Sequence, residues 1–200
     1  EDSVYQVTLA ITAEGGCSDT VTLPVEIFPL PVAIAYADNV CFGQEIQFSD
    51  SSTINSGTID QWNWDFGDAQ TSSIQHPSHL YAEAQNYVYA LTVTSDRGCV
   101  DAIAGTVTTH PIPVSEFDMT SETSCFIPAS VNLFNQSTGA NQFQWNHGNG
   151  IMPTTFNSTA LFDTIGIFSI DLLVTNQFGC QDNSVQIFQV FPTVTADFQT

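Results

Sequence analysis

The stretch Gln61-Trp62-Asn63-Trp64-Asp65-Phe66-Gly67-Asp68 decides the fold. Its aromatic and polar side chains alternate, which is the period of a β-strand with one face in a core. Gly67 and Asp68 then favour a turn, because glycine tolerates positive φ and aspartate hydrogen-bonds to nearby backbone. We therefore expect a strand that places Trp62, Trp64 and Phe66 on one face and ends in a tight turn.

A repeated unit organises the rest of the chain. Residues 5–12, 87–94 and 168–175 share one pattern, an aromatic side chain followed by aliphatic side chains at alternate positions, and the three copies are almost evenly spaced. This alternation predicts a half-buried strand in each copy. Each of these strands is followed by a Gly-Cys pair, and the pairs are Gly16-Cys17, Gly98-Cys99 and Gly179-Cys180.

The turn motif recurs in the second half of the chain. Trp145 and Gly148 stand at the repeat positions of Trp64 and Gly67. Asparagine stands at 146 and 149, where the earlier copy has aspartate at 65 and 68. An acid–base pair would need carboxyl groups at both copies, whereas a turn needs only side-chain oxygens that accept hydrogen bonds. We interpret the shared requirement as structural.

Proline-containing segments separate the copies and predict four parts. Residues 1–31 form the C-terminal part of one module, 32–113 and 114–192 are complete modules, and 193–200 begin a further one. Short strands separated by Gly, Pro, Asn and Ser, without a helical period, predict an all-β sandwich for each module. Because the chain starts and stops within the pattern, we interpret it as a segment of a longer protein.

The order of motifs resembles the PKD (polycystic kidney disease) domain. The match consists of Trp64-Asp65-Phe66-Gly67-Asp68, then His79-Leu80-Tyr81, then the strand that starts at Tyr87. Ala69 departs from the glycine that is usual in this family. The resemblance implies tandem Ig-like β-sandwiches in an elongated array. The motif and core residues are Trp62, Trp64, Phe66, Gly67, Asp68, Tyr81, Tyr87, Trp145 and Gly148.

Acidic residues dominate the charge. The chain carries 21 Asp and Glu against a single basic residue, Arg97, for a formal net charge of −20. Nucleic acids and anionic membranes are bound by clustered Lys and Arg, so the composition argues strongly against nucleic acid as a partner and disfavours anionic membranes. No apolar run is long enough to span a membrane.

The five cysteines follow the repeat. Cys41 and Cys99 belong to the module 32–113, and Cys125 and Cys180 belong to the module 114–192. We predict the disulfides Cys41–Cys99 and Cys125–Cys180, with the partner of Cys17 outside this segment. Disulfides imply an oxidising location outside the cytoplasm. Five unpaired core thiols are the alternative interpretation.

Few residues point to ligand chemistry. His76 and His79 have the spacing of a zinc pair but lack evident further ligands, and a structural role in a loop is favoured. Trp62 could stack on a sugar. Because Trp62 and Trp64 lie on the same face of the predicted strand, a place in the core or at its margin is favoured. No sequence motif of an enzyme is present. Calcium is the more reasonable metal, as some PKD domains bind it; the candidate ligands near the module junctions are Glu26, Asp38, Glu116, Asp118 and Asp197.

We expect a structural or interaction role without catalysis. The acidic repeats resemble the stalks of very large bacterial surface adhesins of the Bacteroidetes type, including those used in gliding motility. The stalk would project an adhesive tip or form a filament, with neighbouring PKD modules and a surface or polysaccharide ligand as partners. Alternatively, the modules are spacers or polysaccharide-binding accessories of a secreted hydrolase. Both interpretations place the chain outside the cell, and the first places it at the cell surface.

Overall fold

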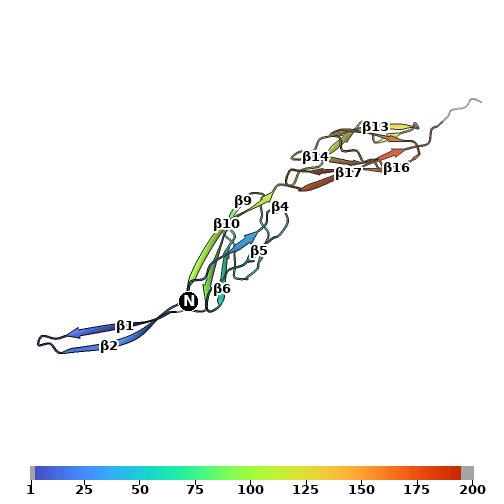
Figure 1. The fold of residues 1–200 in the computed structure, drawn as a ribbon. Helices are drawn as coiled ribbons and strands as arrows, with labels where there is room; N and C mark the ends of the chain where they lie inside the picture. Colours follow the sequence, from blue (N-terminus) through green and yellow to red (C-terminus); the bar gives the residue numbers. More distant parts are fainter. Residues whose placement is uncertain (1–2, 195–200) are drawn as a thin grey trace, which may run out of the picture. The chain divides into compact units, whose positions relative to one another are not determined.

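The computed structural model describes residues 3–194, and every regular element in that range is a β-strand (Figure 1). The chain divides into two compact units, residues 1–109 and 110–200. In residues 3–194 no helix has the length and apolar character needed to cross a bilayer. The predicted start of a further module at 193–200 falls almost entirely outside the described residues.

The first unit begins with a long hairpin and continues into a sandwich, which we call the first module. The hairpin consists of β1 (Ser3–Thr12) and β2 (Ser18–Ile27), paired without interruption from Ser3↔Ile27 to Thr12↔Ser18. The strands of the first module are β3 (Ala35–Ala37), β4 (Val40–Cys41), β5 (Ile46–Asp50), β6 (Ile59–Asp65), β7 (Thr71–Ser72), β8 (Ser78–His79), β9 (Asn86–Ser95) and β10 (Val100–His110).

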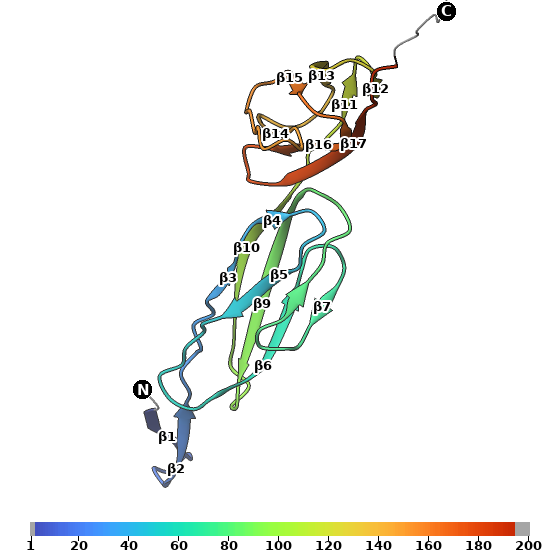
Figure 2. The same ribbon diagram turned by 90° about the vertical axis from the view of Figure 1, so that its right-hand side faces the viewer.

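Two sheets make up the first module (Figure 2). One has the order β4-β10-β9-β6-β7 and the other β3-β5-β8. The alternation along β6 and β9 turns Trp64, Tyr89 and Leu91 inward, where they meet Phe48 from β5. Trp64 and Phe48 pack edge to face with centroids 5.4 Å apart. An aromatic core of this kind is what the alternating stretch at 61–68 predicts.

The second unit contains a second sandwich, the second module, built on the same plan. Its strands are β11 (Phe117–Met119), β12 (Thr123–Ser124), β13 (Ala129–Asn135), β14 (Gln142–Asn146), β15 (Ser158–Phe162), β16 (Gly166–Thr175) and β17 (Gln181–Val190). The sheet orders are β12-β17-β16-β14 and β11-β13-β15. Trp145 takes the place of Trp64 in the core and packs edge to face on Phe117. The all-β, Ig-like architecture expected from the sequence is confirmed.

The N-terminal hairpin has an apolar face with no cover among the described residues. Tyr5 and Leu9 are 55% and 63% exposed, whereas their counterparts Tyr87 and Leu91 in the first module are 6% and 0% exposed. The two pairs occupy the same positions of the repeat. The sequence pattern of a buried strand is therefore present in the hairpin without the sheet that would bury it.

The predicted disulfide pairs are wrong. Cys99 and Cys125 have free thiols in the structure, as does Cys17, whereas Cys41 and Cys180 are each disulfide-bonded. The reason is that the two cysteines of a module lie near opposite ends of one long strand, β10 in the first module and β17 in the second. Sequence spacing placed each cysteine beside a strand, but it did not reveal which end of the sheet that strand would occupy.

Candidate functional site: the Asp-Phe-Gly-Asp turn

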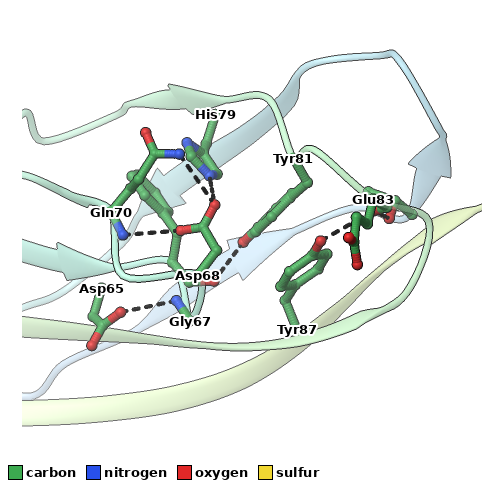
Figure 3. A network of polar contacts seen from close by, with 10 residues as sticks. Asp65, Gly67, Asp68, Gln70, His79, Tyr81, Glu83 and Tyr87 are labelled. Carbon is green, nitrogen blue, oxygen red and sulfur yellow. Dashed lines mark hydrogen bonds and ion pairs between the residues drawn. The ribbon is translucent and has the colours of Figure 1, made fainter.

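The turn after β6 is held by its own acidic side chains (Figure 3). The Asp65 carboxylate accepts a 2.9 Å hydrogen bond from the Gly67 amide. The Asp68 carboxylate accepts one of 3.1 Å from the amide of Gln70. Each carboxylate therefore uses an oxygen to satisfy a backbone group that the turn would otherwise leave unpaired.

Glycine is required at the centre of this turn. Gly67 has φ of 81°, and a Cβ built on it would lie 2.2 Å from the carbonyl oxygen of Val88. Gly148 repeats the arrangement in the second module, with φ of 74° and a Cβ that would lie 2.4 Å from the carbonyl oxygen of Ser169. In both modules the turn packs directly on the backbone of the long central strand, so any side chain would force the two apart.

Aromatic rings connect the turn to the segment His79-Leu80-Tyr81 (Figure 3). Phe66 and His79 stack with centroids 4.1 Å apart and planes 5° apart. Tyr81 packs edge-on against His79 and stacks on Tyr87 at 3.8 Å. The Tyr81 hydroxyl donates a 2.8 Å hydrogen bond to the carbonyl oxygen of Phe66. The motif residues 66, 79, 81 and 87 are thus one packed column.

The polar atoms of this column are paired. His79 Nε2 lies 2.8 Å from an Asp68 oxygen, and the His79 side chain is buried. Burial, followed by the negative charge of Asp68, raises the pKa of Tyr81 well above its ordinary range, so its hydroxyl stays a donor. The arrangement anchors the loop that carries His79 and Tyr81 to the core of the module.

The second module keeps the turn but has asparagine side chains where the first module has aspartates. Asn146 and Asn149 accept the turn hydrogen bonds from the amides of Gly148 and Ile151, at 3.0 and 3.2 Å. His147 replaces Phe66, is buried, and places its Nε2 2.9 Å from the hydroxyl of Ser158. Ala160 stands at the repeat position of His79. What the two modules share is the backbone and the core, which fits a structural role for the acidic pair.

The two histidines proposed as a weak zinc pair are engaged elsewhere. His76 Nδ1 accepts a 3.2 Å hydrogen bond from the Asp50 amide, and His79 pairs with Asp68. In the described part of the chain, no group of three or more His, Cys, Asp or Glu side chains is placed to hold a metal ion.

The calcium candidates are spread over several elements. Glu26 lies on β2, Asp38 follows β3, and Glu116 and Asp118 flank the start of β11, all of them exposed. Asp197 lies outside the described residues. Calcium binding stays a prediction, and among residues 3–194 no three of these carboxylates are placed where they could hold one metal ion.

Trp62 lies at the margin of the first core. Its side chain is partly buried, and its Nε1 donates a 2.7 Å hydrogen bond to an oxygen of Asp50. Burial alone would raise the pKa of Asp50, but hydrogen bonds from Ser52, Gln75 and Trp62 outweigh it and lower that pKa below its ordinary value. Trp62 therefore has a hydrogen-bonding role inside the module, which leaves its ring poorly placed as a sugar platform.

Sequence reasoning missed an anchor at the start of each module. The carboxylate of Asp101 accepts a 2.8 Å hydrogen bond from the Ala33 amide, and the carboxylate of Asp182 accepts one of the same length from the Ser115 amide. Both aspartates follow a Gly-Cys cysteine by two residues, and Asp19 follows Cys17 in the same way. The repeated Gly-Cys-x-Asp spacing was the available signal.

A ring contact accompanies each anchor. The Arg97 guanidinium lies 5.0 Å from the centre of the Phe28 ring, in the first unit. In the second unit His110 and Phe178 stack with centroids 3.8 Å apart. Arg97 and Phe178 occupy the same turn position, directly before the Gly-Cys pair of their module. Each segment that leads into a module is thus held by a hydrogen bond and by a side chain from the same turn.

A surface depression of about 390 Å³ lies on the second module beside Phe143, the counterpart of Trp62. The Phe143 ring packs edge-on against the exposed ring of Phe156. Amide side chains make up half of the lining, which consists of Asn141, Gln142, Phe143, Gln144, Thr154, Leu173, Thr175 and Gln181.

Comparison with known proteins agrees with this geometry. Residues 29–110 match the family model described as the PKD domain. The chain is 31% identical to the PKD1 domain of the Vibrio cholerae metalloprotease PrtV, of which it covers 99%. The chain belongs to the PKD domain family.

Other similarities are to a second solved PKD domain and to proteins much longer than the part that matches. The match to the solved PKD1 domain of PrtV covers 42% of this chain and has a TM-score of 0.37. The PKD1 domain of Vibrio anguillarum Epp is 30% identical to this chain and has a TM-score of 0.39. That match covers 41% of this chain and 95% of the Epp domain. The pre-pro-metalloprotease PrtV of Vibrio cholerae is 27% identical over 68% of this chain and 15% of its own length. Collagenase ColA of Bacillus cereus is 41% identical over 28% of this chain and 6% of its own length. The chain thus spans a small fraction of these proteins.

PKD domains are non-catalytic accessory modules. Membership of the family therefore confirms the expectation that this segment is not itself an enzyme. The column of residues 66, 79, 81 and 87 and the turn at 65–68 hold a PKD module together.

Proposed function

We propose that this segment is a spacer built from tandem PKD modules in a secreted protein. The observation that carries the proposal is that the two turn aspartates of the first module are asparagines in the second. Asp65 and Asp68 become Asn146 and Asn149 while every turn hydrogen bond they make to backbone is kept. A segment selected for its shape tolerates that exchange, whereas one selected for a reactive carboxyl would not.

The finer proposal is that the spacer is the stalk of a very large bacterial surface adhesin or filament, in the manner of those used in gliding motility. Tandem copies, anchored leading segments and a net charge of −20 support this, since like-charged stalks at a cell surface repel one another and stay dispersed. The alternative is a spacer or accessory segment of a secreted hydrolase. The relatives among metalloproteases and collagenases support that alternative. Both proposals place the segment outside the cell.

The division into parts supports a longer array. We propose that the N-terminal hairpin is the last hairpin of another PKD module, because Tyr5, Val7, Leu9 and Ile11 repeat the buried positions 87, 89, 91 and 93 of the first module. An isolated two-stranded hairpin is at best marginally stable in water. Its exposed apolar face therefore fits a sheet supplied by a preceding copy.

Calcium binding is a second and separate proposal for this segment. The exposed carboxylates Glu116 and Asp118 on either side of Phe117 supply the hard oxygen ligands that calcium prefers. Thermal unfolding with excess chelator and with millimolar calcium tests it, and identical midpoints would remove calcium as a ligand.

Single-molecule stretching tests the spacer function. The segment, held between two reference domains under reducing conditions, is expected to unfold in two separate events. Each event should release about 80 residues, or close to 28 nm of extended chain before subtraction of the folded length. Extension without force peaks, or one event for both modules, would contradict a mechanical role for separate modules.

The depression beside Phe143 favours a second candidate, binding of a polysaccharide. An aromatic ring among amide side chains offers an apolar face and hydrogen-bonding groups, which is the combination that sugar rings use. Retardation of the protein in gels that contain a panel of soluble polysaccharides measures this binding. Phe143→Ala should abolish any retardation, and Phe126→Ala, at an exposed phenylalanine outside the depression, is the matched control.

A further inference from the structure

The cysteines fall into two positions of the repeat. The turn cysteines directly precede the second strand of a long hairpin, and each accepts a 2.9 Å backbone hydrogen bond from the residue four positions before it. The edge cysteines lie at the end of the short strand β4 or directly after the short strand β12. The turn cysteines are Cys17, Cys99 and Cys180, and the edge cysteines are Cys41 and Cys125.

The two positions lie at opposite ends of a module. In the second module Ser124 pairs with Val190, the last residue of β17, and Cys125 comes next along the chain. Cys180 directly precedes Gln181, the first residue of that strand. Ten residues of β-strand separate these ends by about 30 Å.

The first module repeats this separation. The amide of Thr108, near the end of β10, donates a 2.8 Å hydrogen bond to the side chain of Asn39, which places β4 at that end. Cys99 precedes the first residue of β10. The Cα atoms of a disulfide lie within about 7 Å, so neither module can form a disulfide between its own two cysteines.

One cysteine of each position is nonetheless disulfide-bonded. Cys180 is a turn cysteine and Cys41 is an edge cysteine, and both are in disulfide form. Their counterparts Cys99 and Cys125 carry free thiols. The local geometry is the same in both copies: the Cys180 amide donates to the Asn176 side chain at 3.0 Å, and the Cys99 amide donates to the Ser95 side chain at 3.1 Å.

We propose that Cys99 and Cys125 also form disulfides in the secreted protein, each with a cysteine of the opposite position in another copy of the module. The bonds would then link copies along the array and would not close any single one. In each reaction two thiols lose two protons and two electrons and form one S–S bond. The electrons pass to the disulfide of an extracytoplasmic thiol–disulfide oxidoreductase, which becomes a dithiol.

Disulfide mapping of the intact secreted protein tests the proposal. Free thiols are blocked with N-ethylmaleimide in denaturant without reductant, and the protein is cut with pepsin at low pH, where thiol–disulfide exchange is slow. Pepsin is needed because the segment has one basic residue and gives trypsin almost no sites. We expect Cys99 joined to a peptide from outside residues 32–113 and Cys125 joined to one from outside 114–192. Maleimide on either cysteine, or a Cys41–Cys99 or Cys125–Cys180 peptide, would overturn the proposal.

Single-residue variants sharpen the result. Cys125→Ser in the intact protein should expose one new maleimide-reactive thiol, on the turn cysteine that loses its partner. Ser124→Ala, at the neighbouring residue, should expose none. If Cys125→Ser also exposes none, Cys125 has no sulfur partner and the inference fails.

Discussion

Ala69 and Gly150 occupy the same position in the turns of the two modules and share the left-handed backbone conformation, with φ of 70° and 89°. Ala69 is the one residue other than glycine with positive φ among residues 3–194. This conformation costs a residue with a Cβ about 1–2 kcal/mol. The first module therefore stores strain that the second module avoids.

Ala69→Gly should stabilise the first module by about 0.5–1 kcal/mol, because relief of the strain exceeds the extra entropy of glycine in the unfolded chain. Urea unfolding of the full chain, followed by hydrogen exchange in peptides of the first module, measures the change. Gly150→Ala is the matched control. A Cβ at Gly150 meets nothing within 4 Å, so that variant should lose a similar amount through backbone strain alone. A less stable Ala69→Gly protein would show that the turn differs in solution.

The Asp68 side chain should be replaceable by asparagine. Asp68→Asn keeps an oxygen for the Gln70 amide and a partner for His79, and Asn149 already does the first of these tasks in the second module. We expect a cost below about 1 kcal/mol for Asp68→Asn and about 1–3 kcal/mol for Asp68→Ala, which leaves buried polar groups unpaired.

The two Asp68 variants remove the same charge, so the comparison isolates the hydrogen bonds. Urea midpoints of the first module at pH 7 give both values. Equal losses for asparagine and alanine would mean that the carboxylate charge, and not the turn geometry, is what Asp68 contributes.

The parts of this structure that could be predicted are those that depend on local pattern. The alternation around Trp64 and Trp145 is enough to place both in cores, because a strand with one apolar face has one way to bury it. The Gly-Asp signal is enough to place the turn, since the backbone conformation there follows from the residue types. The repeat then extends both conclusions to the second module.

The cysteine partners could not be predicted, because they depend on which end of a sheet a two-residue edge strand joins. β12 runs parallel to β17 and so places Cys125 beside the last residue of that strand. Nothing in the residues around Cys125 indicates this direction. The anchoring role of Asp101 and Asp182 was missed for a related reason, since their amide partners at Ala33 and Ser115 are far away in sequence.

The second module should lose stability in mild acid through His147. Burial lowers the pKa of this imidazole below its ordinary value of 6.5. The unfolded chain then binds the proton more readily than the folded one. The stability that neutral His147 contributes to the second module is therefore complete above pH 6.5 and is lost as the pH falls below that value. His147→Phe, which installs the residue of the first module, should remove this part of the pH dependence.

Hydrogen exchange in peptides around Trp145, measured between pH 5 and pH 8 at fixed urea and corrected for intrinsic rates, follows the stability of the second module. Carboxylates titrate in both proteins, so the quantity to compare is the difference between wild type and His147→Phe. A difference that does not change with pH would show that the pKa of His147 is the same in the folded and the unfolded chain.

The N-terminal hairpin should be poorly protected although its ladder is complete. β1 and β2 pair along their whole length, but the side chains of Tyr5, Leu9 and Leu23 remain exposed. Backbone pairing without burial gives little stability, so the hairpin amides should exchange within about tenfold of the unfolded rate. Deleting residues 1–27 should leave the thermal midpoint of the first module unchanged and should lower the fluorescence of a dye that binds exposed apolar surface.

Supplying the missing sheet should reverse this behaviour. A chimera with a copy of residues 32–86 fused before Tyr5 would place counterparts of β3 to β8 next to the hairpin. We expect the amides of Val7 and Leu9 to become protected to the same degree as those of Tyr89 and Leu91, because they would occupy the same core positions. A matched chimera with Leu9→Asp should fail to gain protection. If the hairpin is instead protected in the present chain alone, its apolar face is covered by a second copy of the chain, and protection would then fall on dilution.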